Sequence, residues 1–511
     1  MTNRILTGIF STWASFLLTA ITSLIMAPFL VHRLGNEGYG LWSLYMAITG
    51  YFTLLDFGVS PAIVRYTSKL QALGDKDAER RILVTGLAFF SCASLIVLGV
   101  TLMGTAFYDV LFPSPAVPMW AARMTFLLVG LDFTFTLPFA VFQGILLGHQ
   151  RYLALNGLNI LIRLLRFALV IMLVKDGAMG LVTVAVIFFV TGLVRDLGMF
   201  TAGRSAFSGR LRRRDMDRNA LRELLSYSIP AFVISMALRV MAYTDSLVIG
   251  YTIGVGAITY FALAASLVDY VQELGWGLAG VLVPVVSAHE ARGELDPIRE
   301  KFLQFTRYCV WMMAPVVAIT LVLAKPFFTR WVGAEYHVSA EILILLMWAM
   351  AVYVIQLPAQ AVLKGMSLHR RLAMFMAIEA AMNLVISIVL ARQLGVIGVA
   401  LGTLIPRLLM NGLFLPAYIM RVLAIPLRQY LLEAIVPVIP GVVGLALLAW
   451  GMGNRSAGPL GWPAMVGIGL LNVFVFSSLT LMFATNARER SWLLERSSGV
   501  LARVRRFAGS T

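Results

Sequence analysis

The chain has 511 residues, of which 60% are hydrophobic and 13% are charged, and its formal net charge is +16. Soluble domains carry roughly 25% charged residues, so this composition excludes a soluble protein and predicts a membrane protein. Apolar runs of ~20 residues, each long enough to span a bilayer, recur along the whole sequence. No stretch is polar enough for long enough to form a separate soluble domain.

Fourteen apolar segments follow one another along the chain. They cover residues 5–31, 41–63, 82–107, 121–147, 153–174, 178–202, 227–252, 258–286, 308–324, 341–363, 372–391, 396–419, 431–451 and 460–484. The first segment is longer than a signal-peptide core and lacks a cleavage pattern, so we expect it to be an uncleaved span. The predicted fold class is an all-α polytopic membrane protein with about fourteen transmembrane helices.

The connections between these segments alternate in basicity. One set, which includes Arg4 and the C-terminal tail, holds 29 Lys and Arg residues, and the opposite set holds seven. Basic residues concentrate on the cytoplasmic side of a membrane, so both termini are expected in the cytoplasm. Most of the net charge therefore reflects topology, and we expect no nucleic-acid partner.

The fifth segment carries a polar stripe. Asn156, Asn159, Arg163 and Arg166 are spaced by three, four and three residues, which places them on one face of a helix. Each arginine at bilayer depth costs at least ~2.5 kcal/mol by insertion scales. Two interpretations stay open. The arginines pair with a carboxylate of a neighbouring helix such as Asp132, or they line a wet cavity that holds an anion.

Other segments also place charged or hydrogen-bonding side chains at membrane depth. These residues include Asp56, Asp132, Arg239, Asp245, Asp269, Tyr270, Glu273 and Arg407. Intramembrane ionisable residues usually face a bundle interior or a water-filled cavity. Taken together, they predict a polar cavity between the two halves of the chain, although interhelical ion pairing explains any single one of them.

An offset of about 219 residues brings the two halves of the chain into register. The stretch "LGNEGYGLWSLYMAITGYFTLLDFG" in the first half lies over "IGVGAITYFALAASLVDYVQELGWG", and "DGAMGLVTVAVI" lies over "LGVIGVALGTLI". The overlay pairs Gly35 with Gly254, Ser68 with Ser287, Gly74 with Gly293, Arg80 with Arg299 and Leu137 with Leu357. Each half then holds six spans, so the halves share one orientation, as in transporters with parallel repeats.

This repeat predicts the domain organisation. We expect an N-terminal six-helix bundle in residues 1–220, its repeat in 221–425, helices 13 and 14 in 426–484 and a basic cytoplasmic tail in 485–511. No Walker motif, HExxH motif or metal-spaced Cys/His cluster is present, so no ATP, metal or other cofactor is expected. We expect a transporter and no enzymatic activity.

The stretch "LGNEGYGLWSLYMAITGYFTLLDFGVSPAIVRYTS", residues 34–68, resembles the start of the bacterial polysaccharide-lipid flippases. These are the O-antigen and exopolysaccharide repeat-unit translocases of the multidrug/oligosaccharidyl-lipid/polysaccharide exporter superfamily. The resemblance implies two six-helix bundles around a lumen that opens alternately to each side of the bacterial inner membrane. Its cargo would be an undecaprenyl-diphosphate-linked repeat unit, moved to the outer leaflet during polysaccharide biosynthesis. The resemblance does not identify a sugar.

The same resemblance assigns roles to the polar residues within the spans. The arginines Arg163, Arg166, Arg239 and Arg407, with Asn159 and Tyr270, would bind the anionic head group, because arginine forks match phosphate oxygens. The carboxylates Asp56, Asp132, Asp245, Asp269 and Glu273 would bind a coupling H⁺ or Na⁺, or would neutralise the arginines. Polysaccharide polymerase and glycosyltransferases are the implied partners, beside membrane lipids.

One departure concerns the lipid II branch of the superfamily, whose members concentrate arginines in their first two spans. Here only Arg4 precedes the first span and Arg65 ends the second, which argues against lipid II as the cargo. By analogy with that branch, segments 13 and 14 would frame a groove for the lipid tail.

Three alternatives stay open. A multidrug or organic-cation antiporter of the same architecture would favour acids and aromatic residues in its cavity, without four arginines. A membrane glycosyltransferase or ligase is disfavoured by the short outward loops, because such an enzyme is expected to carry a large external loop. In a purely structural scaffold, the polar stripes would only hold helices together.

Overall fold

The computed structural model describes residues 2–111, 117–207, 209, 212–453 and 460–483, and every regular element within these ranges is a helix. This confirms the all-α fold class. Backbone groups cannot hydrogen-bond to lipid, so a spanning segment satisfies them internally, and a helix does so without partners. The predicted basic tail in 485–511 lies outside the described residues.

The chain divides into two compact units, which comprise residues 1–266 with 373–403 and residues 267–372 with 404–511. The first unit contains α1 (Thr2–Phe52), the 3-10 helix η1 (Thr53–Asp56), α2 (Val59–Leu73), α3 (Lys76–Ala106), α4 (Tyr108–Leu111), α5 (Met119–Gly148), α6 (Tyr152–Leu173), α7 (Gly177–Ala206), the 3-10 helix η2 (Arg213–Asp215) and α8 (Arg218–Thr252). Parts of α9 (Val255–Gly280) and α14 (His369–Leu409) belong to each unit.

The second unit contains shorter and more interrupted helices. They are α10 (Leu282–Glu290), α11 (Leu295–Trp331), the 3-10 helix η3 (Ala334–Tyr336), α12 (His337–Ile355), α13 (Leu357–Gly365), the π-helix η4 (Met410–Phe414), α15 (Leu415–Val422), α16 (Leu427–Tyr430), the π-helix η5 (Leu431–Ile435), the 3-10 helix η6 (Val436–Val438), α17 (Ile439–Gly453) and α18 (Trp462–Phe483). The predicted repeat boundaries at residues 220 and 425 stay predictions.

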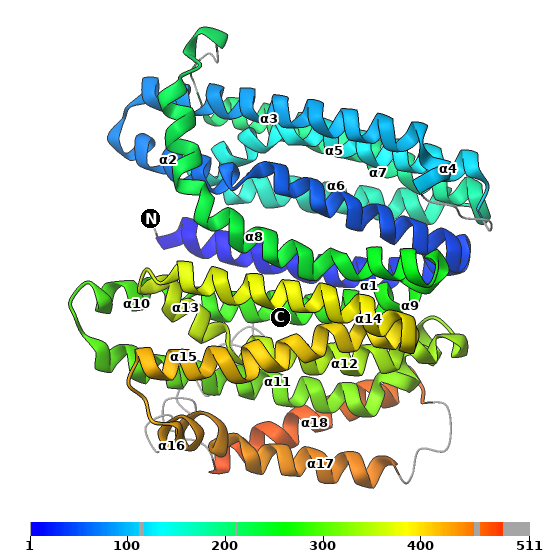
Figure 1. Cartoon of the computed structure of the whole chain (residues 1–511), viewed down its shortest axis with the longest axis vertical. Coiled ribbons are helices and arrows are strands. Elements are labelled where there is room, and N and C mark those ends of the chain that lie inside the picture. Colours follow the sequence, from blue (N-terminus) through cyan, green and yellow to red (C-terminus); the bar gives the residue numbers. More distant parts are fainter. Residues whose placement is uncertain (1, 112–116, 208, 210–211, 454–459, 484–511) are drawn as a thin grey trace, which may run out of the picture. The chain divides into compact units, whose positions relative to one another are not determined.

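The described residues contain 12 helical stretches that are long and apolar enough to cross a membrane. Two of them hold two predicted segments each, because α1 and α14 turn at Gly35 and Gly395. Both glycines have positive φ, at 70° and 62°, a conformation that is unfavourable for other residues. In Figure 1 the blue ribbon of α1 turns back on itself in this way. The fourteen predicted segments therefore correspond to these 12 stretches.

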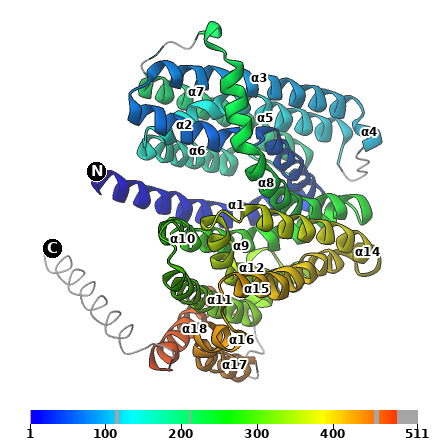
Figure 2. The same cartoon turned by 60° about the vertical axis from the view of Figure 1, so that its left-hand side comes forward.

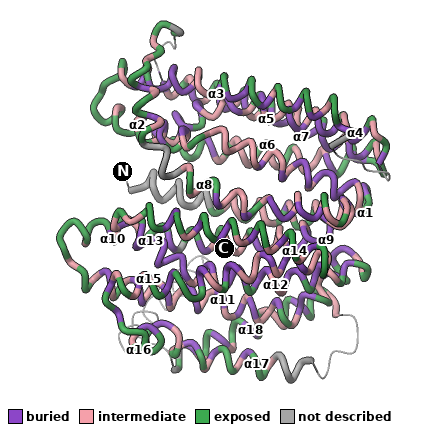
Figure 3. Tube along the Cα trace, in the orientation of Figure 1, coloured by how far each residue is buried: buried purple, intermediate pink, exposed green. Residues whose placement is uncertain are grey.

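In the first unit, α3, α5 and α7 pack side by side and α2 closes one end of this layer. Buried positions follow the faces that these helices turn toward one another (Figure 3). Small residues permit the close approach, as membrane helices require. At Gly130 of α5, an added Cβ would lie only 2.9 Å from the Cβ of Thr101 on α3.

In the second unit, α11 packs against α12 and also against α17 and α18. Figures 1 and 2 both show α17 and α18 side by side. A buried apolar cluster of Val310, Val438, Leu445 and Phe476 joins these elements. The two C-terminal helices are thus fixed to the second unit through α11.

The internal repeat is visible as paired local structures in the two halves. Gly35 and Gly254, Gly74 and Gly293, and Gly177 and Gly395 are matched in the sequence overlay, and all six have positive φ. The Ser68 hydroxyl donates to the Gly148 carbonyl oxygen at 3.0 Å, and the matched Ser287 hydroxyl donates to that of Gly365 at 3.2 Å. These pairs support the predicted repeat.

One part of the overlay is shifted by about one helical turn. Aligning Leu137 with Leu357 places Gly148 opposite Leu368, whereas the serine contacts make Gly365 its counterpart. A shift of three residues keeps the same face of a helix toward the core, so the apolar pattern alone does not exclude it.

Candidate functional site

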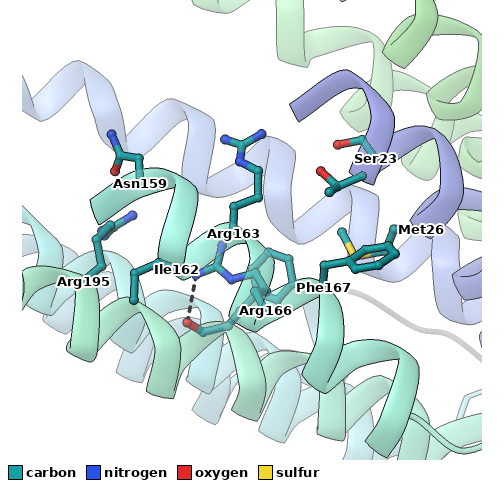
Figure 4. Close-up of a pocket in the computed structure, with 10 residues that line it drawn as sticks. Ser23, Met26, Asn159, Ile162, Arg163, Arg166, Phe167 and Arg195 are labelled. Carbon is teal, nitrogen blue, oxygen red and sulfur yellow. Dashed lines mark hydrogen bonds between the residues drawn. The ribbon is translucent and has the colours of Figure 1, made fainter. Parts of the chain in front are cut away.

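A cavity of about 260 Å³ lies within the first unit, among α1, α6 and α7. Its lining residues are Thr22, Ser23 and Met26 of α1, Asn159, Ile162, Arg163, Arg166 and Phe167 of α6, and Phe188 and Arg195 of α7. In Figure 4 the three arginines stand on the α6 and α7 side, with Ser23 and Met26 opposite. Three of the four residues on the predicted polar face of the fifth segment, Asn159, Arg163 and Arg166, therefore line one cavity, and Arg195 adds a third guanidinium group.

Arg166 is fixed in position by contacts with α7. Its Nε donates to the hydroxyl of Thr191 at 2.9 Å and its Nη2 donates to the Phe188 carbonyl oxygen at 3.3 Å. The guanidinium carbon also lies 4.0 Å from the centre of the Phe188 ring. Trp42 packs edge-on against that ring, with centroids 4.6 Å apart. These contacts orient the Arg166 guanidinium within the cavity and hold it against α7.

Arg195 is held by a buried carboxylate. Its Nε and Nη2 lie 3.0 and 2.9 Å from Oδ1 of Asp196, and Nη2 also donates to the Thr136 hydroxyl at 2.8 Å. Thr136 in turn donates to Oδ2 of Asp196 at 2.9 Å. Both oxygens of this carboxylate are thus engaged. Charged hydrogen bonds of this kind are stronger than neutral ones and fix geometry.

Asp132 of α5 is the second carboxylate near the arginines. It interacts electrostatically with Arg195 and Arg166, but within the described residues it forms no ion pair at hydrogen-bonding distance with either. Its Oδ1 is buried and accepts no hydrogen bond from a described residue. The predicted ion pair between an arginine and Asp132 is therefore not formed among the described residues, and only a longer-range attraction to Arg195 and Arg166 is present.

Arg163 and Asn159 complete the polar wall contributed by α6. Arg163 lies close enough to Arg166 for their charges to repel. Three arginines against the two carboxylates Asp132 and Asp196 leave an excess of positive charge here, which favours an anion, and the planar guanidinium fork matches phosphate or carboxylate oxygens. Arg195 was assigned no role from the sequence. Its position within the apolar segment 178–202 could have marked it as a candidate for the same site.

Arg239 and Asp56 lie together elsewhere in the first unit. Asp56 attracts Arg239 electrostatically, and Arg239 donates to the Tyr243 hydroxyl at 3.2 Å. Asp56 Oδ1 accepts the backbone N–H of Ser60 at 2.8 Å at the start of α2. Asp56 thus has a helix-capping role, beside any role in ion binding.

Asp245 of α8 belongs to a separate buried polar cluster in the first unit. It is 3% exposed and accepts hydrogen bonds from Ser387 at 3.2 Å and Thr403 at 2.8 Å. The amide of Asn383 donates to the Thr403 hydroxyl at 3.1 Å and to the Gly402 carbonyl oxygen at 3.2 Å. This cluster concentrates oxygen atoms, which are the ligands of hard cations and acceptors for a proton.

The remaining predicted residues lie in the second unit. Arg407 is buried, with its guanidinium carbon 4.3 Å from the centre of the Tyr353 ring. Asp269 and Glu273 are exposed on α9 one turn apart and repel each other, and Tyr270 beside them is half-buried. The structure thus brings Asn159, Arg163 and Arg166 into one cavity of the first unit. The predicted residues Asp269, Tyr270, Glu273 and Arg407 lie in the second unit.

Comparisons with known proteins agree with this architecture. A family model for "Polysaccharide biosynthesis protein" matches residues 5–289. The uncharacterized membrane protein EpsK of Bacillus subtilis (strain 168) is 22% identical over 491 residues, which cover 94% of this chain and 96% of that protein.

Two solved structures show the fold. The lipid II flippase MurJ, in an inward closed conformation, gives a TM-score of 0.69 at 16% identity and covers 93% of this chain and 98% of that chain. An inward-facing multidrug resistance MATE family transporter of the MOP superfamily gives a TM-score of 0.63 at 16% identity, with 80% and 95% covered. The chain is therefore a multi-pass membrane protein with the MurJ and MATE fold.

Proposed function

Because the chain belongs to the polysaccharide biosynthesis protein family, we propose that it flips lipid-linked polysaccharide repeat units across the membrane. The cargo is an undecaprenyl-diphosphate-linked oligosaccharide, carried from the cytoplasmic to the outer leaflet by alternating access. Flipping makes and breaks no covalent bond, so the protein needs no catalytic residue.

The observation that carries this proposal is the cavity lined by Arg163, Arg166 and Arg195. A lipid-linked repeat unit presents a diphosphate between its lipid and its sugars, and this anion must cross the apolar part of the membrane. Guanidinium forks replace the water that the phosphate oxygens lose. Arg166 and Arg195 are already oriented by Thr191, Phe188 and Asp196, so less ordering is needed on binding.

The alternative of a cation antiporter shares the fold, since a MATE transporter is among the similar structures. Its cargo would carry the wrong charge for this cavity, because like charges at close range repel. The lipid II flippase among the similar structures supports a lipid-linked cargo. A membrane glycosyltransferase or ligase gains no support from the cavity.

We place the protein in the bacterial inner membrane with both termini in the cytoplasm, as the charge distribution of its loops predicts. The remaining arginines, Arg239 and Arg407, would contact the cargo in other stages of transport. Polysaccharide polymerase and glycosyltransferases would act before and after this step.

The driving force is assigned to a coupling ion, H⁺ or Na⁺, at one of the predicted carboxylates. Asp245 is the best supported of them, because it is buried and shares its oxygens with two hydroxyl groups. A buried carboxylate is stabilised by a bound cation or proton, so ion binding there would change the packing of α8 against α14.

The test is the flipping of a fluorescent undecaprenyl-diphosphate oligosaccharide by the full-length protein in proteoliposomes. Wild type is compared with Arg163→Ala/Arg166→Ala, and Arg33→Ala serves as the matched control because Arg33 forms an exposed ion pair with Asp176. We expect flipping by wild type and by the control and little flipping by the double variant. Transport of cationic dyes without lipid-linked sugar would establish the antiporter instead.

A further inference from the structure

The two carboxylates behind the arginines differ in how they are held. Asp196 engages both of its oxygens, with Arg195 and Thr136 as partners. Asp132 has a buried Oδ1 that accepts no hydrogen bond from a described residue, although Arg166 and Arg195 attract it. A buried acceptor without a donor is costly and calls for an explanation.

The position of Asp132 depends on a missing side chain. Oδ1 of Asp132 lies against Gly192 of α7, and an added Cβ at Gly192 would approach that oxygen to 2.0 Å. Gly192 follows Thr191, whose hydroxyl accepts the Nε hydrogen bond of Arg166. The carboxylate thus occupies a niche beside the arginine contacts, and no hydrogen bond from a described residue holds its Oδ1 there.

We propose that Asp132 is the displaceable counter-charge of the cavity: it neutralises Arg166 and Arg195 when no cargo is bound, and it competes with the cargo diphosphate for them. This inference rests on the proposed function. Asp132 acts through the arginines and is a positioning residue. It limits how tightly the diphosphate is held, which allows the cargo to leave once the protein has opened to the other side of the membrane.

The competition links binding to protonation. Among the described residues, the charged groups that face Asp132 are Arg166 from α6 and Arg195 and Asp196 from α7. The helices α1, α2 and α3 also pack against α5, and their described residues add no further charge there. An ionised Asp132 attracts the guanidinium groups and repels the diphosphate, whereas a protonated one does neither. Affinity for the diphosphate is therefore highest at low pH and falls as Asp132 ionises, by linkage.

The experiment measures binding of farnesyl-diphosphate-linked N-acetylglucosamine to the purified full-length protein over a pH series. For Asp132→Asn we expect at least about fivefold tighter binding at the upper pH and a flatter pH profile. Gly192→Ala, which displaces the carboxylate, is expected to act in the same direction.

Two matched controls accompany these variants. Asp176→Asn removes a carboxylate outside the cavity, where Asp176 pairs with exposed Arg33, and Gly157→Ala adds a methyl group on α6 where no atom lies within 4 Å. Both are expected to bind as wild type does. Melting temperatures of all variants report whether they are folded.

The outcomes separate the two proposals. If Arg166→Ala loses binding but Asp132→Asn keeps the wild-type affinity and pH profile, the arginine site stands and the counter-charge is overturned. If Asp132→Asn weakens binding and Gly192→Ala changes nothing, Asp132 supports the structure only. If wild type does not bind the diphosphate at all, both proposals fail.

Discussion

Arg166 and Phe188 are joined by two contacts, because the guanidinium carbon lies 4.0 Å from the centre of the aromatic ring and Nη2 donates to the carbonyl oxygen of the same residue. One residue of α7 thus fixes both the plane and the direction of the cation. Lysine has a comparable charge but no planar fork. Replacing Arg166 by lysine therefore separates the effect of its charge from the effect of its geometry.

We expect Arg166→Lys to reduce flipping at least about tenfold although the charge is kept, because one charge-assisted hydrogen bond contributes about 1.5 kcal/mol or more. Initial flipping rates in proteoliposomes measure the change. Arg33→Lys, at an exposed ion pair, is the matched control. Equal rates for wild type and Arg166→Lys would mean that only the charge matters at this position.

Phe188→Leu keeps an apolar side chain but removes the aromatic face under Arg166. A cation–π contact contributes about 1 kcal/mol, so we expect diphosphate affinity to fall about fivefold and thermal stability to fall slightly. Phe189→Leu is the control, since Phe189 packs against Phe135 and does not line the cavity. An equal loss of affinity in both variants would contradict the orienting role of Phe188.

The Thr136 hydroxyl joins Arg195 to Asp196. Thr136→Val removes this hydroxyl with little change of volume, and we expect a loss of about 1 kcal/mol of stability and a measurable loss of diphosphate affinity. Thr136→Ser, which retains the hydroxyl, should restore both. A serine variant as defective as the valine variant would show that the methyl group is the important part.

The Asp245 cluster predicts an ion dependence. Asp245→Asn removes the buried charge, and we expect flipping to become insensitive to whichever of Na⁺ or H⁺ drives wild type. Flipping is measured in Na⁺ or choline buffers and over a pH series. Thr403→Val is expected to weaken the ion dependence because Thr403 donates to Asp245 at 2.8 Å, and Thr403→Ser to preserve it. Unchanged ion dependence in Asp245→Asn would place the coupling site elsewhere.

The repeat predicts matched effects in the two halves. A Cβ at Gly148 would lie 2.7 Å from that of Thr67, and a Cβ at Gly365 would lie 2.7 Å from that of Val286. Overpacking of this kind typically costs 1 to about 3 kcal/mol, so Gly148→Ala and Gly365→Ala should lower the melting temperature to a similar extent. Gly99→Ala, in α3 with no atom within 4 Å, should not lower it.

The sequence predicted the helical fold because apolar length and loop charge are properties of single segments. It also predicted that Asn159, Arg163 and Arg166 share a face, because their spacing follows the helical period. The matched pair Gly35 and Gly254 was also predictable, because a position that requires a positive φ usually carries glycine, and a glycine is visible in the sequence.

Other features depended on contacts between helices. Nothing in the sequence pairs Arg195 with the α6 arginines, or brings Ser23 of α1 to the same cavity. The relation of Asp132 to Gly192 was equally hidden, because a small residue opposite a carboxylate has no periodic signal. The sequence overlay matched Gly148 with Leu368, one helical turn away from its structural counterpart Gly365. A shift of one turn keeps the same face of the helix buried, so the apolar pattern did not reveal it.

The size of the cavity limits what it can recognise. About 260 Å³ is below the ~300 Å³ at which pockets for drug-sized ligands begin, so it admits the diphosphate end of the proposed cargo and leaves most of the glycan outside. If the proposed function holds, repeat units of different lengths and sugars would present the same diphosphate to it. A strain that acquires new glycosyltransferases would then not need a new arginine cavity, and discrimination among glycans would fall to surfaces beyond it.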